Sequence, residues 1–246
     1  RRNYYVNKKN FRVMETFISA PFGNYIKPKK CIPVTGTWTL QPRGNRALSV
    51  LKTLRYNRQL GGWTNKLSLS NPGIAVGSVK TQDHEVLSIA QVDEGDFAML
   101  NYKIWSSQNL EINLSCPNIS QVGIWTDVKI FLKSGRDWCI AKVSPLITLE
   151  DIEYLIDDIG FTQIHFSNTL PISAGGLSGP ELRPYTLELI KLTRKHFGDK
   201  VTIIAGGGIQ HIGHVTEYMN AGANHISLGS VCFNPIKLWK LLRALR

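Results

Sequence analysis

Short apolar segments alternate with longer amphipathic ones along most of this chain. Eight segments carry the short apolar pattern of strands, at residues 16–20, 32–35, 84–92, 109–115, 138–143, 162–167, 201–205 and 225–228. Helical periodicity follows the later strands, at residues 96–105, 126–133, 149–159, 182–196, 212–220 and 236–245. Repeated strand-helix units predict a parallel sheet, and eight of them predict an α/β protein with a closed (β/α)8 TIM barrel.

Two stretches depart from this regular alternation. Only residues 21–30 separate the first two strands, which is near the lower limit for a parallel crossover, so we expect the first helix to be vestigial or absent. Residues 41–73 carry Gly and Pro clusters and one short helical pattern near 47–54. Long insertions of this kind usually cover binding sites, so residues 41–73 are predicted to form a lid or substrate loop after strand two.

Length and composition favour a single domain. The chain has 246 residues and 43% hydrophobic composition, which suits one barrel of about 250 residues spanning residues 1–246. Its apolar stretches are too short to cross a bilayer, and residues 1–11 lack the apolar core of a signal peptide. The four cysteines are far apart and indicate neither a disulfide framework nor a metal site: Cys31, Cys116, Cys139 and Cys232. We therefore expect a soluble, cytoplasmic protein with reduced thiols.

The charge of the chain is positive but spread out. Lys and Arg number 29 against 18 Asp and Glu, a formal net charge of +11. Local concentrations occur at residues 27–30, 43–58 and 237–246. Because the remaining charges are dispersed, this balance favours attraction of small anionic molecules and argues against a nucleic-acid partner. The basic, amphipathic segment 237–246 is expected to pack on the barrel as its last helix, without inserting into a membrane.

The strand at residues 109–115 ends in chemically active side chains. Leu110, Ile112 and Leu114 alternate with polar residues, and Pro117 then forbids further ladder pairing. Cys116 follows directly, at the strand edge where parallel α/β proteins bind their ligands. A thiol exchanges a proton near neutrality when its surroundings help, so Cys116 is a candidate base or nucleophile.

Two glycine clusters predict a phosphate site. Residues 205–208 (Ala-Gly-Gly-Gly) end the seventh strand, and residues 228–230 (Leu-Gly-Ser) end the eighth. In such barrels the loops after these two strands bind phosphate, since backbone N–H groups can close around the anion. Lys142 ends the fifth strand, and an inward-facing lysine there needs an anionic partner. A loop with amides and glycines, residues 167–180, follows the sixth strand.

Together these segments resemble the dihydroorotate dehydrogenase family of FMN-dependent barrels, over roughly residues 88–246. The motifs are Asn-Leu-Ser-Cys-Pro-Asn at 113–118, Ala-Lys-Val-Ser-Pro at 141–145, Ser-Asn-Thr at 167–169, Gly-Gly-Leu-Ser-Gly at 175–179, Gly-Gly-Gly-Ile at 206–209 and Leu-Gly-Ser at 228–230. The resemblance implies oxidation of dihydroorotate to orotate in pyrimidine biosynthesis, with hydride transfer to FMN. It also implies that Cys116 is the base, as in the soluble branch of the family.

The resemblance assigns further residues to the site. It implies that the substrate is bound by Asn65, Asn113, Asn118, Asn168 and Thr169. It implies that FMN is bound by Ala20, Ser88, Asn113, Lys142, Ser178, Gly179, Gly207, Gly208, Gly229 and Ser230. The electron acceptor and the oligomeric state stay open, although members of the family are often homodimers. The partner is a small molecule, dihydroorotate or a related dihydropyrimidine.

One position departs from the family pattern. The family has a lysine at the end of strand two, and Gly36 aligns there; Lys66 and Arg43 are candidates to replace its charge. Two alternatives remain. One is a flavoenzyme similar to tRNA dihydrouridine synthases, which the net charge favours but whose strand motif and C-terminal domain are not seen. The other is a flavin-binding protein without dehydrogenase activity.

Overall fold

A closed parallel barrel forms the centre of the molecule, which confirms the predicted fold class. The computed structural model describes residues 14–115, 125–132 and 135–246. In spatial order the barrel strands are β1 (Thr16–Ile18), β12 (His225–Leu228), β11 (Thr202–Ala205), β8 (Gln163–Phe166), β7 (Cys139–Val143), β6 (Leu110–Asn113), β5 (Val86–Ile89) and β2 (Ile32–Trp38). Each lies within or over a segment predicted as a strand, although β2 runs three residues beyond its predicted end.

The barrel strands bury their two faces in different ways. Leu110 and Ile112 of β6 face outward into the core between the barrel and its helices. A smaller apolar cluster fills the inside of the barrel, made of Phe17, Val34, Val86, Ile140 and Ile204. Side chains alternate between the two faces of a strand, so the next inward positions towards the carboxyl ends are polar residues or glycines: Ser19, Gly36, Ser88, Lys142 and Gly206. The apolar cluster thus closes the barrel below a polar layer.

Helices cover the outside of the barrel. They are α2 (Ile74–Lys80), α3 (Asp96–Lys103), α4 (Leu149–Glu153), α5 (Arg183–Phe197), α6 (Ile212–Ala221) and α7 (Pro235–Ala244), with short turns η2 (Phe22–Asn24), η5 (Pro180–Leu182), η6 (Gly198–Lys200) and η7 (Ser230–Phe233). The first helix is reduced to the 3-10 turn η2, as expected. Two predicted helices differ in kind: residues 126–133 correspond to a 3-10 helix, η3 (Trp125–Phe131), and residues 149–159 continue from α4 into a π-helix, η4 (Tyr154–Ile159).

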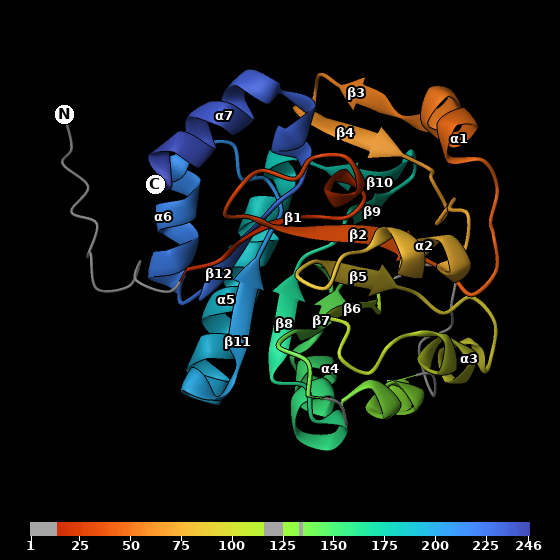
Figure 1. Cartoon of the computed structure of the whole chain (residues 1–246). Helices are drawn as coiled ribbons and strands as arrows, with labels where there is room; N and C mark the ends of the chain where they lie inside the picture. The colour runs from red at the N-terminus through yellow and green to blue at the C-terminus, as the bar shows by residue number, and fades with distance from the viewer. Residues whose placement is uncertain (1–13, 116–124, 133–134) are drawn as a thin grey trace, which may run out of the picture.

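A small antiparallel sheet joins two loops of the barrel. Its order is β3 (Arg55–Asn57), β4 (Gly62–Asn65), β10 (Gly175–Ser178) and β9 (Leu170–Ile172). The insertion 41–73 supplies β3, β4 and α1 (Arg46–Thr53), whereas β9 and β10 come from the segment predicted as an irregular loop at 167–180, so that prediction was wrong. In Figure 1 the arrows of β8 and β11 point towards the side of the molecule on which this sheet lies. The sheet therefore stands at the carboxyl ends of the strands.

A row of contacting aromatic side chains connects the small sheet to the barrel loops. Trp63 of β4 packs against Phe233 of η7 with ring centroids 4.4 Å apart, and Phe233 meets Phe22 of η2 at 4.8 Å. Tyr56 of β3 extends the row, 5.3 Å from Trp63. This aromatic row links the insertion to the loops after β1 and β12.

Candidate active site

Four polar side chains meet inside the barrel on neighbouring strands. Ser88 of β5 pairs in register with Glu111 of β6, and Lys142 of β7 pairs with His165 of β8. Glu111 Oε1 accepts hydrogen bonds from Ser88 Oγ (2.8 Å) and Lys142 Nζ (3.3 Å), and Oε2 accepts one from His165 Nδ1 (2.7 Å). None of the four is more than 4% exposed. The inward lysine predicted from the sequence thus has Glu111 as its anionic partner.

The protonation states of this cluster follow from its surroundings. Burial opposes ionisation of Glu111, but the Lys142 cation and the hydrogen bonds from His165 and Ser88 outweigh it and bring the pKa of Glu111 to about 2. Burial lowers the pKa of His165, and Glu111 offsets only part of that effect. A neutral His165 must carry its proton on Nδ1 to donate to the carboxylate, which leaves Nε2 as an acceptor without a partner among the described residues.

A second polar layer lies at the strand ends, above this cluster. Thr37 Oγ1 is 3.1 Å from Ser88 Oγ and accepts a bond from Asn113 Nδ2 (3.4 Å). Asn113 Oδ1 accepts from Ser115 Oγ (2.8 Å) and from Asn168 Nδ2 (3.2 Å), and Asn168 Nδ2 also donates to Ser115 Oγ (2.6 Å). One continuous network therefore runs from the buried Glu111 to the amides at the carboxyl face.

The glycines after β11 form a second part of the site. Gly207 and Gly208 have φ values of +81° and +71°. A Cβ on Gly208 would come within 2.8 Å of the Gly179 carbonyl oxygen, and one on Gly207 would lie 3.0 Å from Leu182. Only glycine combines this backbone conformation with such close approach. Of the predicted cofactor residues, Gly208 thus packs against Gly179 at the end of β10, and Gly207 packs against Leu182.

The loop after β12 lies beside the end of β1. A Cβ on Gly229 would be 3.7 Å from Ser19 Oγ, and Ser19 Oγ is itself 2.6 Å from Ser227 Oγ. Ser230 Oγ accepts a hydrogen bond from Gln210 Nε2 at 3.4 Å. Small side chains and hydroxyls therefore line both loops that the sequence assigned to a phosphate.

Comparison with known proteins finds the same family that the sequence motifs resemble. The dihydroorotate dehydrogenase family model matches residues 149–243. The catalytic subunit of dihydroorotate dehydrogenase B (NAD(+)) from Oceanobacillus iheyensis is 27% identical over 222 residues, covering 74% of this chain and 71% of that protein. The subunit of the same name from Petrotoga mobilis is 28% identical over 230 residues, covering 75% and 72%.

The chain is thus similar in sequence to the dihydroorotate dehydrogenases. A crystal structure of DHODH in complex with ferulenol, from Eimeria tenella, shares the fold with a TM-score of 0.73 and 18% identity, over 94% of this chain and 80% of that one. The barrel is therefore common to both, while the residues of the site have to be argued from this chain.

Several residues that the family resemblance assigned stand apart from the network. Asn65 of β4 donates from Nδ2 to the Gly176 carbonyl (3.4 Å) and accepts from Leu67 N, so its amide holds the insertion in place. Thr169 does reach the network, through its backbone N, which donates to Asn168 Oδ1 at 2.9 Å. Ala20 packs on the inner apolar cluster, and Ser178 pairs with Trp63 in the small sheet. Cys116 and Asn118 lie outside the described residues.

The backbone conformation and close surroundings of Gly36 leave no room for a side chain. Its φ is +105°, and a Cβ would come within 2.5 Å of the Ser88 carbonyl oxygen. The cation at this point is Arg46, whose Nη2 donates to the Gly36 carbonyl (3.3 Å) while the guanidinium lies 5.9 Å over the Trp38 ring. Arg43 pairs through its backbone with Asn71, and Lys66 is exposed. Sequence reasoning considered those two cations and missed Arg46.

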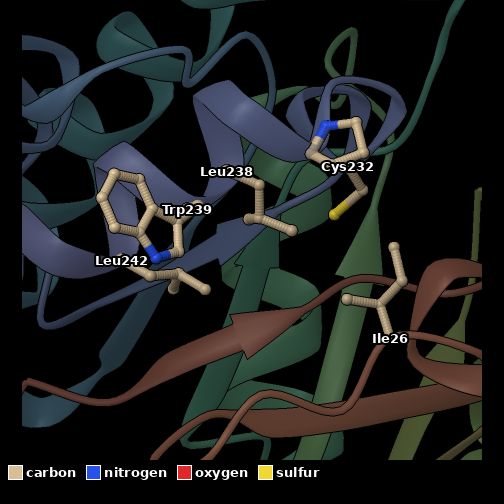
Figure 2. Close-up of a pocket in the computed structure, with 6 residues that line it drawn as sticks. Ile26, Cys232, Leu238, Trp239 and Leu242 are labelled. Atoms are coloured by element: carbon tan, nitrogen blue, oxygen red, sulfur yellow. The ribbon is translucent and has the colours of Figure 1, made fainter.

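A groove elsewhere on the surface does not suit a phosphorylated ligand. It has a volume of about 290 Å³ and is lined by Ile26, Cys232, Pro235, Leu238, Trp239 and Leu242. Figure 2 shows Leu238, Trp239 and Leu242 along α7, with Ile26 facing them. No charged or amide side chain lines it, so it offers nothing to orient an anion.

The described residues give no sign of a membrane span or a metal centre. Within residues 14–115, 125–132 and 135–246, no helix is both long and apolar enough to cross a bilayer. The same part of the chain holds no group of three His, Cys, Asp or Glu residues arranged for a metal ion. Cys31, Cys139 and Cys232 are free thiols.

Proposed function

We propose that this protein oxidises dihydroorotate to orotate with FMN as cofactor and Cys116 as the base. The observation that carries the proposal is the continuous network from Glu111 to Asn168 at the carboxyl face of a barrel related to dihydroorotate dehydrogenases. Amides offer donors and acceptors together, which suits the ring imide of a dihydropyrimidine. The names of the relatives support the same substrate.

The residues present fit a phosphorylated flavin. Gly179, Gly207 and Gly208 each bring the backbone closer to neighbouring protein atoms than a Cβ would allow. Loops of this kind, with backbone N–H groups free of side chains, are the usual provision for a phosphate. Lys142 uses one of its three N–H donors on Glu111, so two remain for a ligand as far as the described residues show. The other residues of the proposed FMN set are Ala20, Ser88, Asn113, Ser178, Gly229 and Ser230. When bound, FMN would supply the acceptor for the hydride.

The protein's own contribution is binding and proton transfer. Asn113 and Asn168 would orient the substrate ring, with Asn65, Asn118 and Thr169 as the further proposed contacts. Ser115, the residue before Cys116, is already fixed by Asn113 and Asn168. The Cys116 thiolate would then remove a ring proton, a role that typically contributes about 10²–10⁴ in rate.

The test is an anaerobic titration of the FMN-loaded protein with dihydroorotate while the flavin absorbance is followed. We expect stoichiometric bleaching, slowed by about 10²-fold or more in Cys116→Ala. Cys31→Ala is the matched control, because burial raises the pKa of Cys31 to about 11 and Cys31 precedes β2, at the amino end of that strand. A flavin that stays oxidised with excess dihydroorotate would refute the proposed substrate.

A further inference from the structure

Glu111 and Lys142 form an ion pair inside the barrel, at the level where its interior turns from apolar to polar. The Nζ and Oε1 atoms are 3.3 Å apart, and the two side chains are 5% and 1% exposed. Solvent screens such a pair very little. At a ligand beside Lys142, the carboxylate charge offsets a substantial part of the ammonium field, so Lys142 does not act there as a lone cation.

His165 keeps this pair electrically balanced. Its Nδ1 lies 2.7 Å from Glu111 Oε2, and Nε2 finds no acceptor among the described residues that would favour a second proton. Nε2 instead faces Gly206, where a Cβ would be only 2.9 Å away. A neutral His165, an anionic Glu111 and a cationic Lys142 sum to a net charge of zero.

We propose that Glu111 and His165 are positioning residues that hold Lys142 in a neutral cluster, so that bound FMN has a lower midpoint potential than a lone Lys142 would give. This inference rests on the proposed function, since it requires FMN at this face. Reduced flavin is the electron-richer form, and a nearby unbalanced cation stabilises it relative to oxidised flavin. Glu111 offsets a substantial part of that preference.

The first test is the midpoint potential of FMN bound to Glu111→Gln, measured by equilibration with a reference dye. The variant keeps the shape of the side chain but leaves Lys142 unbalanced. We expect the bound reduced form to gain at least tenfold over the oxidised form, which is a positive shift of about 30 mV or more for a two-electron couple. An unchanged potential would overturn the inference.

Glu85→Gln is the matched control. Glu85 is also fully buried and paired with a lysine, with Lys27 Nζ 2.6 Å from its Oε1, but it precedes β5 and so lies at the opposite end of the barrel. We expect its potential to equal that of the wild type. A shift as large as that of Glu111→Gln would show a general effect of lost buried charge, and would also overturn the inference.

A double variant keeps the test valid if Glu111→Gln does not fold. Glu111→Gln with Lys142→Gln removes both charges, and removing both partners of a buried pair is far better tolerated than removing one. If the cluster is balanced, the midpoint potential of the double variant should lie within about 30 mV of the wild type, which is a tenfold change in the preference for reduced flavin. If Lys142 acts as a lone cation, the midpoint potential should fall by more than that. Failure of the wild-type protein to bind FMN would instead refute the proposed function.

Discussion

Gly36 ends the regular part of β2 with a backbone that an L side chain rarely adopts. Gly36→Ala has to accept both the positive φ and a contact of 2.5 Å with the Ser88 carbonyl oxygen. Backbone strain costs about 1–3 kcal/mol and overpacking a similar amount, so we expect the free energy of unfolding to fall by roughly 3 kcal/mol or more. Gly36→Lys should lose at least as much, so the family's lysine cannot simply be restored. Urea denaturation of the two variants measures their free energies of unfolding.

Gly61→Ala separates the two contributions at Gly36. Gly61 also has a positive φ, +56°, but a Cβ there meets nothing within 4 Å. Its loss should be close to the backbone cost alone, about 1 kcal/mol. Equal losses for the two alanine variants would mean that the contact with Ser88 relaxes freely and that the close approach does not exclude a side chain.

At the scale of elements, the aromatic row should determine how firmly the small sheet is attached to the barrel. Phe233→Ala removes ring contacts with both Phe22 and Trp63. Each pair contributes about 0.5–1.5 kcal/mol beyond area burial, so we expect a loss of roughly 2–3 kcal/mol and faster amide exchange in β4. Tyr102→Ala, which truncates a ring that is 87% exposed, should stay within about 0.5 kcal/mol. Unchanged exchange in β4 would show that the row does not anchor the sheet.

The same elements show what sequence patterns can predict. All eight barrel strands were predicted, because each is a compact apolar run and the outward face of each needs a hydrophobic core. The hairpin of β9 and β10 was missed because residues 170–178 are rich in glycine and depend on pairing with β4, far away in the sequence. The π-helix η4 was missed because its apolar spacing matches an α-helix.

The polar residues inside the barrel show how much of the site could be predicted from the sequence. Ser88, Asn113, Lys142 and Asn168 were proposed from the sequence and join one network. Glu111 and His165 were not proposed, because a polar residue alternating with apolar ones looks the same whether its face meets solvent or a barrel interior. Both lie on barrel strands in register with Ser88 and Lys142. Once closure of the barrel is inferred, Glu111 and His165 can be assigned to the same inward face as Ser88 and Lys142, and this identifies them as site residues.

For the molecule as a whole, the barrel interior should make stability fall in acid. His225 accepts a hydrogen bond from Glu15 N on Nδ1 and packs near Phe17 and Trp138; burial lowers its pKa to about 4. In the folded state His225 therefore binds a proton at lower pH than in the unfolded chain, where histidines titrate near 6.5. The stability linked to neutral His225 is full above pH 6.5 and is lost as the pH falls towards 4. Buried His165 acts in the same direction.

Glu111 extends this loss to lower pH, because its pKa of about 2 lies below that of an unfolded glutamate. Urea midpoints measured from pH 7 to pH 4 should fall steadily in the wild type and less in His225→Asn, whose side-chain oxygen can still accept from Glu15. His196→Gln is the surface control for replacing a histidine, because His196 lies on α5 with its side chain 45% exposed. A His225→Asn profile parallel to the wild type would place the acid sensitivity outside this end of the barrel.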